Sequence, residues 1–354
     1  MLVNQATPHL ARRRCLVSGG AGFIGSHLVD RLLARGDHVT VVDNLSTGRD
    51  ANLPGTAPDL RFIRAGLSQT LPTLAGEIAG GGETFDEVYH LAAAVGVKLV
   101  IDDPIGSIET NVAQTGELLR FVHQVCPRAA LLIASSSEVY GKSERIPFRE
   151  DDDVTYGPTT KSRWSYACSK AIDEYLALAY HQQHALRVVI ARFFNTVGPR
   201  QVGDYGMVLP RFVGAALRNE PITVHGDGRQ TRCFCDVRDV ASVLPRMLEK
   251  GACIGRVLNV GGDRSISMID LAHRVKTTLS SSSEVRLIPY DQAYSIAFED
   301  LRQREPDLSR LRGAVGFEPE FTLERTIADL AEELGARPAG APGAPATPLR
   351  GNVR

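Results

Sequence analysis

The segment Cys15-Leu16-Val17-Ser18-Gly19-Gly20-Ala21-Gly22-Phe23-Ile24-Gly25 decides the fold. Its first four residues predict a short buried strand, and residues from about 26 to 34 predict a helix. The glycines at 19, 22 and 25 permit a tight turn, close approach of the backbone to a pyrophosphate, and close packing of the helix on the strand. Free amide groups at the start of the helix would face that anion. The segment therefore predicts a dinucleotide site, against the alternative of a turn without ligand.

A second predicted strand, residues 38–42, supports this interpretation because it ends in Asp43. An acid at about this distance from the glycines binds the ribose hydroxyls of a dinucleotide. Since Asp43 would repel a 2′-phosphate, the sequence favours NAD over NADP. The expected cofactor contacts are Gly19, Gly22, Phe23, Ile24, Gly25, Asp43, Asn44, Leu91, Ala92 and Ala93.

Predicted strands and helices then alternate along the chain. Further strands are expected at 60–64, 87–91, 129–134 and 186–190, with helices at about 104–125 and 165–184. This alternation predicts an α/β fold with a doubly wound parallel Rossmann sheet. Ligands of such sheets bind at the carboxyl ends of the strands. Asp43, Ala92, residues 135–138 and Asn195 all fall at such ends.

Beyond Asn195 the pattern loosens into shorter pieces separated by glycine and proline, which predicts a smaller α/β lobe that binds substrate. We expect an NAD-binding domain at 12–195 plus about 226–261. The nucleotide-sugar-binding lobe would comprise 196–225 plus about 262–334. Residues 335–354 are rich in Ala, Pro and Gly and predict a disordered tail.

The composition narrows the class of partner. The chain has 354 residues, 43% of them hydrophobic, and a formal net charge of -1. This balance gives no electrostatic reason to expect nucleic acid or an anionic membrane as partner. Without an apolar run long enough to span a bilayer, or a signal peptide, we expect a cytoplasmic protein. The six cysteines lie in segments of core character and predict free thiols, and no metal site is expected.

Tyr166 and Lys170 are the candidate catalytic pair. Residues four apart on a helix project from one face, so both side chains can act on one atom. A neighbouring ammonium favours the phenolate and lowers the tyrosine pKa towards that of a useful base. The alternative is a surface lysine beside a half-buried tyrosine.

With the glycine turn, Asp43 and the serines at 135–137, this pair resembles the extended short-chain dehydrogenase/reductase (NAD-dependent epimerase/dehydratase) family that modifies nucleotide sugars. The resemblance covers about 15–330 and implies that NAD oxidises the sugar transiently. The Ser/Thr, Tyr, Lys trio of the family corresponds to Ser136, Tyr166 and Lys170, and Tyr166 and Lys170 are implied to contact the NAD as well. The resemblance also implies a homodimer formed by the helices at about 104–125 and 165–184. Its apolar candidates are Leu118, Leu119, Val122, Leu176, Leu178 and Tyr180, unless the sheet buries them.

Within this family the chain resembles UDP-glucuronate decarboxylases. Ser137 replaces the acidic Asp of sugar dehydratases, whereas Glu138 is shared with the decarboxylases. The segment 228–234 resembles the decarboxylase segment whose Arg reaches the reacting end of the substrate, here Arg232. The same resemblance gives Asn195, Val208, Arg211, Arg304 and Asp307 as contacts of the UDP moiety.

The implied product is UDP-4-keto-pentose and/or UDP-xylose, formed by loss of carbon dioxide after oxidation at C4. A UDP-glucuronate 4-epimerase and a non-catalytic NAD-binding regulator are the alternatives. Two simpler interpretations also stay open. Glu138 could cap nearby backbone amides, and Arg232 could pair with Asp236.

Overall fold

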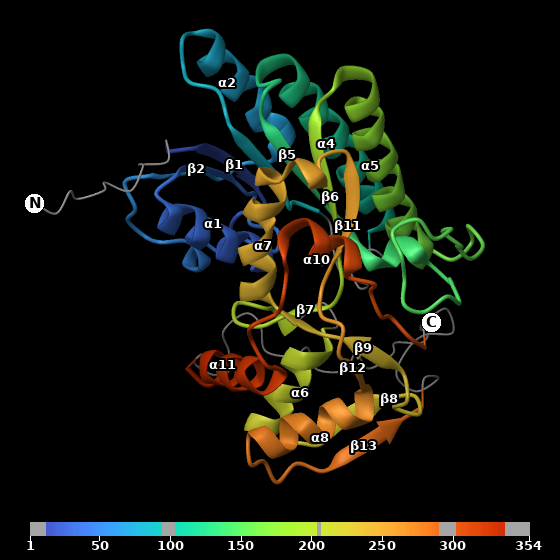
Figure 1. Cartoon of the computed structure of the whole chain (residues 1–354). Coiled ribbons are helices and arrows are strands. Elements are labelled where there is room, and N and C mark those ends of the chain that lie inside the picture. The colour runs from blue at the N-terminus through green and yellow to red at the C-terminus, as the bar shows by residue number, and fades with distance from the viewer. Residues whose placement is uncertain (1–11, 94–102, 204–206, 290–301, 337–354) are drawn as a thin grey trace, which may run out of the picture.

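The computed structural model describes residues 12–93, 103–203, 207–289 and 302–336. Its main body is a seven-stranded sheet in the order β11-β6-β5-β4-β1-β2-β3 (Figure 1). The strands are β1 (Arg14–Ser18), β2 (His38–Val42), β3 (Leu60–Ile63), β4 (Glu87–His90), β5 (Ala130–Ser136), β6 (Arg187–Phe193) and β11 (Arg256–Val260). All neighbouring strands in it are parallel, which confirms the predicted fold class.

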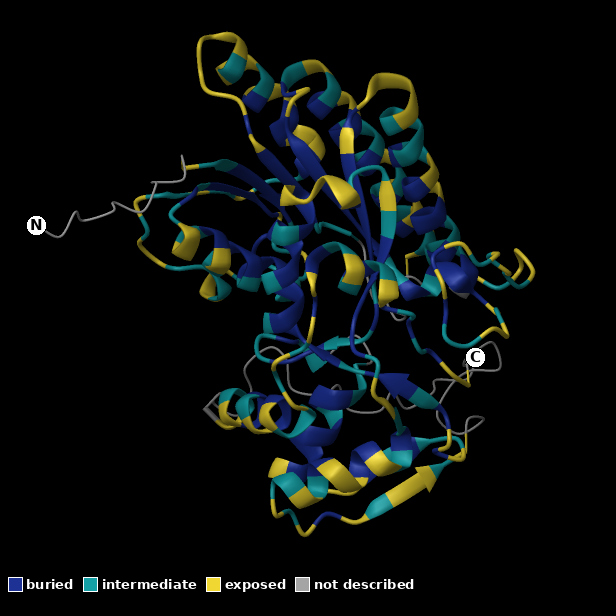
Figure 2. Cartoon of the chain, viewed as in Figure 1, coloured by how far each residue is buried: buried dark blue, intermediate teal, exposed yellow. Residues whose placement is uncertain are grey.

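Helices cover both faces of this sheet, as the almost wholly apolar central strands require. One face packs against α1 (Phe23–Arg35), α7 (Val237–Glu249) and α10 (Ser309–Val315). The other packs against α2 (Leu67–Ala79), α4 (Pro104–Val125) and α5 (Arg163–His184). Figure 2 shows the resulting buried strands between partly exposed helices. Helix α1 starts at Phe23, three residues before the predicted start, because Gly25 lets its first turn pack on the glycine loop.

A smaller lobe lies below the sheet in Figure 1 and has its own apolar core. It contains α6 (Val208–Leu217), α8 (Met268–Thr278) and α11 (Leu323–Ala336). The parallel pair β8 (Ile222–His225) and β13 (Val285–Ile288) completes it. Helix α11 includes Gly335 and Ala336, which the sequence assigned to the tail, and the rest of the tail lies outside the described residues.

Short paired strands connect the lobe to the sheet. Strand β7 (Thr196–Val197) pairs with β10 (Cys235–Asp236) in parallel. Strand β9 (Thr231–Cys233) pairs with β12 (Ser265–Ser267) in antiparallel fashion. The chain thus leaves the main body after β6 and returns to it with α7 and β11, so the two parts are connected more than once.

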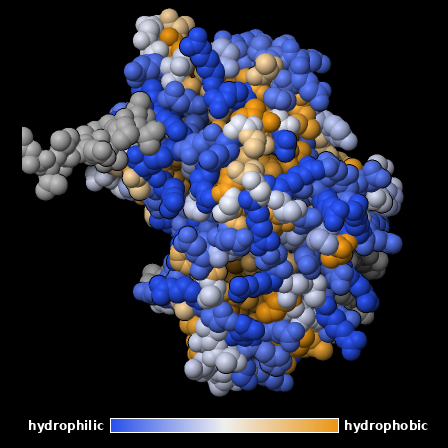
Figure 3. All heavy atoms as spheres, viewed as in Figure 1, coloured by the Kyte–Doolittle hydropathy of each residue, from blue (hydrophilic) through white to orange (hydrophobic). Residues whose placement is uncertain are grey.

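The surface and the cysteines agree with the composition. None of the helices in the described ranges combines the length and apolar character needed to span a bilayer. The face seen in Figure 3 is mainly hydrophilic with scattered apolar patches. All six cysteines are free thiols, as predicted. Cys15 lies in a buried cluster with Asp37 and Glu87, but Arg35 pairs with both carboxylates, so a guanidinium already compensates their charge.

Candidate active site

The glycine turn connects β1 to α1 at the point where the strand order of the sheet reverses. Gly19 has a positive φ of 75°, and a Cβ atom there would lie 2.6 Å from the backbone nitrogen of Ala92. A Cβ at Gly25 would overlap the carbonyl oxygen of Gly19. Side chains are therefore excluded at both positions. The turn leaves its backbone open at the crevice where parallel α/β sheets bind nucleotides, so the predicted cofactor contacts fit NAD.

Asp43 closes this turn from the end of β2. Its Oδ2 accepts a hydrogen bond from the backbone N–H of Ala21 at 2.9 Å, and its Oδ1 accepts one from Leu45 at 2.8 Å. The side chain is buried, and each carboxylate oxygen keeps a further lone pair. Asp43 thus has a structural role in the turn in addition to its predicted role as ribose ligand.

We expect Asp43→Asn to weaken NAD binding about tenfold, because a charge-assisted hydrogen bond contributes about 1.5 kcal/mol. Titration calorimetry with NAD and NADP measures the effect, and discrimination against NADP is expected to fall as well. Asp50→Asn provides the control, since Asp50 lies on the following loop with an exposed side chain. Equal NAD affinity in the Asp43 variant and the native protein would contradict the ribose role.

Strand β5 delivers the serine and glutamate candidates. It ends at Ser136, and the 3-10 helix η2 (Ser137–Tyr140) follows directly. The Ser136 hydroxyl accepts a hydrogen bond from the backbone N–H of Glu138 at 3.2 Å. The same hydroxyl bonds to the phenol of Tyr166 on α5. Ser137 is buried. The structure therefore brings Ser136 and Tyr166 together, and Ser136 caps the start of η2.

The electrostatics around Tyr166 differ from the prediction. Burial and the nearby Glu138 charge raise the Tyr166 pKa, the hydrogen bond from Ser136 lowers it, and Asp173 raises it further. The Lys170 ammonium, which was expected to lower this pKa, instead contacts Asp173 Oδ2 at 3.1 Å. An ammonium held by a carboxylate has less charge to offer a phenolate.

Glu138 pairs with Arg304 from the segment before α10. The Arg304 Nη1 lies 2.6 Å from Glu138 Oε1, and the two side chains are 10% and 21% exposed. Arg304 Nε is buried without a hydrogen-bond partner among the described residues. A second acceptor is therefore needed at this guanidinium. Arg304 was predicted to contact the UDP moiety, which stays a prediction, and its ion pair with Glu138 places it beside the turn that follows β5.

Arg232 lies on β9 and is buried. Its Nη1 donates a hydrogen bond to the carbonyl oxygen of Thr231 at 2.7 Å. Asp236, the partner considered for it, forms an ion pair with Arg238 at 2.7 Å. Arg238 approaches this carboxylate from the first turn of α7, so Asp236 is compensated without Arg232.

The remaining predicted substrate residues lie on separate segments: Asn195 between β6 and β7, Val208 and Arg211 on α6, and Asp307 before α10. The backbone carbonyl of Asn195 accepts a hydrogen bond from Cys235. Val208 begins α6, and Arg211 on the same helix donates to the carbonyl oxygen of Thr223. Asp307 pairs with Arg149 at 3.2 Å and accepts from Ser309, which together lower the Asp307 pKa. Its role as a ribose ligand stays a prediction.

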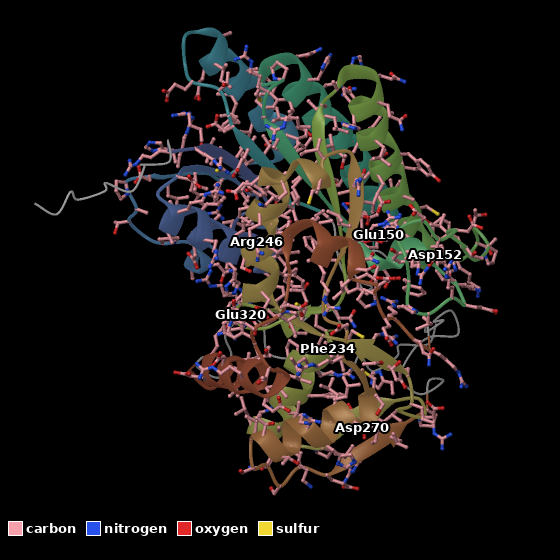
Figure 4. The ribbon with its side chains drawn as sticks, viewed as in Figure 1. Glu150, Asp152, Phe234, Arg246, Asp270 and Glu320 are labelled. Atoms are coloured by element: carbon pink, nitrogen blue, oxygen red, sulfur yellow. The ribbon has the colours of Figure 1, made fainter. Side chains whose placement is uncertain are left out.

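A buried polar network behind β5 was missed by sequence reasoning. Glu174 on α5 accepts a hydrogen bond from the Ser135 hydroxyl. It also accepts two from the Arg192 guanidinium, at 2.9 and 2.7 Å. Tyr140 donates to Asn259 at 2.7 Å, and Asn259 in turn donates its backbone N–H to Glu150, labelled in Figure 4. These contacts fix the strand end that carries Ser136. The sequence signal for this network was a charged residue within an apolar pattern, Arg192 in β6 and Glu174 in α5.

Comparisons with known proteins identify the family. The model described as "NAD dependent epimerase/dehydratase family" matches residues 15–261. A UDP-N-acetyl-alpha-D-glucosaminuronate decarboxylase of Bacillus cytotoxicus is 38% identical over 320 residues, 89% of this chain and 96% of the relative. UDP-glucuronic acid decarboxylase 4 of Arabidopsis thaliana is 36% identical over 329 residues, 92% of this chain and 69% of the relative.

Solved structures support the same assignment. A UDP-glucose 4-epimerase of Thermus thermophilus, in complex with NAD, superposes with a TM-score of 0.77 at 28% identity. The match covers 91% of this chain and 99% of the epimerase. The predicted family and the predicted NAD cofactor are thereby confirmed. This chain belongs to the NAD dependent epimerase/dehydratase family.

Proposed function

We propose that this protein is a UDP-glucuronate decarboxylase. It oxidises C4 of the sugar, releases the C6 carboxyl group as carbon dioxide, and gives UDP-4-keto-pentose and/or UDP-xylose. The observation that carries this proposal is the meeting of the Ser136–Tyr166 hydrogen bond with the Glu138–Arg304 ion pair at the end of β5. The decarboxylase relatives from a bacterium and a plant support it.

The first step needs a base at the C4 hydroxyl. Tyr166 takes this proton, while Ser136 holds the same oxygen through its hydroxyl. Bound NAD supplies the hydride acceptor and later the hydride donor. The glycine turn and Asp43 position that cofactor in the crevice. Because the Tyr166 pKa is raised in its buried setting, the base depends on positive charge brought close to it.

The second step breaks the bond between C5 and C6. Once C4 is a ketone, the C6 carboxylate is beta to it. Carbon dioxide can then depart, because the electron pair of the broken C5–C6 bond is delocalised onto O4. Tyr166 and Ser136 hold that oxygen and stabilise the enolate, which becomes the 4-keto pentose when C5 takes a proton from water. A substrate carboxylate beside Glu138 would be repelled, but Arg304 supplies a compensating charge at 2.6 Å from Glu138. We therefore propose Arg304, together with or in place of Arg232, as the partner of the reacting carboxylate.

The nucleotide part of the substrate is proposed to lie against the lobe. Asn195, Val208, Arg211, Arg232 and Asp307 remain the proposed contacts. The separate apolar core of the lobe supports the proposed division into an NAD-binding domain and a nucleotide-sugar-binding lobe, except that α10 of the range 262–334 packs on the sheet. Of the proposed contacts, Arg232 lies on the short strand β9, whereas Val208 and Arg211 lie on helix α6 of the lobe.

A second substrate of the same chemistry is favoured by one relative. The Bacillus cytotoxicus protein is named for UDP-N-acetylglucosaminuronate, which differs from UDP-glucuronate at C2. The proposed steps involve C4, C5 and C6, so both sugars could undergo them. Both substrates therefore belong in the first experiment.

Purified protein would be mixed with NAD and each UDP-uronate, followed by mass spectrometry and carbon dioxide detection. Loss of the mass of carbon dioxide is the expected result, with loss of two further hydrogens for the 4-keto product. Unchanged mass with a new sugar isomer would make the protein a 4-epimerase. Stoichiometric NAD binding without turnover of either sugar would favour the regulator.

We also propose a homodimer formed by α4 and α5. The apolar residues expected at this interface belong to the core instead: Leu118, Leu119 and Val122 are buried, and Leu176, Leu178 and Tyr180 pack against the same cluster. The core therefore buries the residues from α4, whereas Leu176, Leu178 and Tyr180 of α5 stay partly exposed. Other residues leave an apolar surface on these helices, with Ile105 and Tyr175 both 70% exposed, Ile172 48% and Ile108 41% exposed.

We expect the double variant Ile105→Glu/Tyr175→Glu to be monomeric at concentrations at which the native protein is dimeric. Charges desolvated in an apolar interface cost several kcal/mol, enough to raise the dissociation constant more than a hundredfold. Light scattering after size-exclusion chromatography measures this. Leu287→Glu is the matched control, because Leu287 is 53% exposed on β13 in the lobe. A native protein that is already monomeric would overturn the proposed interface.

A further inference from the structure

Three ionisable side chains follow one another on a single face of α5. Tyr166, Lys170 and Asp173 are spaced by four and three residues, which places them in a row along the helix. The Lys170 Nζ lies 3.1 Å from Asp173 Oδ2, and the side chains of this pair are 2% and 0% exposed. Lys170 thus stands between Tyr166 and Asp173 along the helix, and its ammonium contacts the Asp173 carboxylate.

The charge of the buried Asp173 carboxylate is compensated by this lysine. Its second oxygen, Oδ1, is buried without a hydrogen-bond partner among the described residues. Burial raises the Asp173 pKa, Lys170 and the Thr115 side chain lower it, and the adjacent Glu174 raises it. Among the described residues, Lys170 is the cation that the structure pairs with this carboxylate.

The other titratable neighbour supplies no charge. His90 on β4 is buried, bonds to the Ser18 hydroxyl at 2.7 Å, and lies 3.2 Å from Thr115 Oγ1. Burial and the Lys170 charge lower the His90 pKa to about 3, so the imidazole is neutral at physiological pH. It therefore cannot replace Lys170 as counter-ion of Asp173.

We propose that Asp173 is a positioning residue that anchors the Lys170 ammonium and competes with the Tyr166 phenolate for it. This inference deepens the proposed function, since it assigns a control on the same catalytic tyrosine. When two anions share one buried ammonium, each reduces the electrostatic stabilisation that the ammonium gives the other. The groups that act on Tyr166 are Ser136 and Glu138 from β5 and η2 and Asp173 from its own helix, and Lys170 holds this Asp173 carboxylate.

The competition favours protonated Tyr166. A protonated phenol is the form that stabilises the enolate and returns a proton to O4 when the ketone is reduced. Asp173 therefore assists the later steps of the reaction at the expense of the first proton abstraction. Removing its charge would release the ammonium towards Tyr166 and make the phenolate easier to form.

The test follows the ionisation of Tyr166 directly. The NAD-loaded protein would be labelled with ¹³C at the tyrosine ζ carbon and titrated by NMR, with Tyr166→Phe used to assign the resonance. Asp173→Asn is expected to lower the titration midpoint by about half a pH unit or more. Asp173→Ala is a second uncharged variant should the amide disturb the helix. Asp173→Glu, which keeps the charge, is expected to restore the native midpoint.

The matched control is Asp239→Asn. Asp239 is also buried, but on α7, where it accepts from the backbone N–H groups of Glu320 and Phe321. Its loss can reduce stability but is expected to leave the Tyr166 midpoint unchanged. An unchanged or raised midpoint in both uncharged Asp173 variants would overturn the inference, as would an equal shift in the control. The titration needs no sugar turnover, so its failure is distinct from failure of the proposed substrate.

Discussion

Tyr166→Phe is expected to lower the turnover of the UDP-uronate about a thousandfold, within the range that loss of a positioned general acid–base causes. The phenylalanine ring keeps the shape of the side chain, so the packing of α5 is preserved. What is lost is the oxygen that takes the C4 proton and later holds the enolate. Initial rates of carbon dioxide release at saturating substrate measure the effect.

The controls for this variant separate chemistry from binding. NAD affinity is expected to stay within a few-fold of native, because the glycine turn and Asp43 are untouched. Tyr175→Phe, a change of the same type at a 70% exposed position on the same helix, is expected to retain full turnover. A Tyr166→Phe protein that kept a tenth of native turnover would remove this residue from the mechanism.

Arg304→Ala is expected to lower turnover about a hundredfold, equivalent to roughly 3 kcal/mol. The change leaves the Glu138 carboxylate without its ion pair beside the Tyr166 phenol, whose ionisation that charge already opposes. The remaining carboxylate would also repel the carboxylate of the substrate. Steady-state kinetics distinguish this effect on turnover from an effect on substrate affinity.

A double-mutant cycle isolates the pair. Glu138→Gln combined with Arg304→Ala is expected to recover part of the loss, because no uncompensated charge remains. Arg232→Ala tests the competing assignment, since Arg232 and Arg304 were both candidates for the substrate end. If Arg232→Ala lowers turnover more and Arg304→Ala lowers only substrate affinity, the contact with the UDP moiety predicted for Arg304 is the better assignment.

Local patterns predicted much of the fold. The strand before the glycine turn, the acid after β2 and the alternation of strands with helices lead directly to the parallel sheet, because each signal depends on neighbours in the chain. Helix α4 was predicted with its observed bounds. The ends of α1 and α11 were not, since a glycine inside a helix reads as a break until its packing partner is known.

The contacts that tune the site were harder to predict. Glu138 and Arg304 are far apart in sequence and meet only through the fold, so no local pattern joins them. Lys170 had two possible partners at helical spacing, Tyr166 behind it and Asp173 ahead. Sequence reasoning weighed only the tyrosine, whereas the structure pairs the ammonium with the carboxylate.

Which apolar residues of α4 and α5 are buried was also hard to predict. A helix with apolar residues on more than one face does not reveal which face the sheet covers. Leu118 and Leu119 are fully buried in the core, whereas Ile105 and Ile172 remain exposed. Assigning the stripe required the position of α2 and the sheet beside these helices.

The late return of the chain at β11 has a consequence for synthesis. Strand β6 carries the fully buried Val188, Val189 and Ile190, and its outer edge is covered by β11. Residues 194–255 must be made before that partner exists. A nascent chain that ends within the lobe therefore presents an open, apolar strand edge, the kind of surface that recruits other chains. Shortened products of this gene are expected to aggregate or to bind chaperones on the ribosome. The sheet gains its last strand, β11, only after Val260 has left the ribosome.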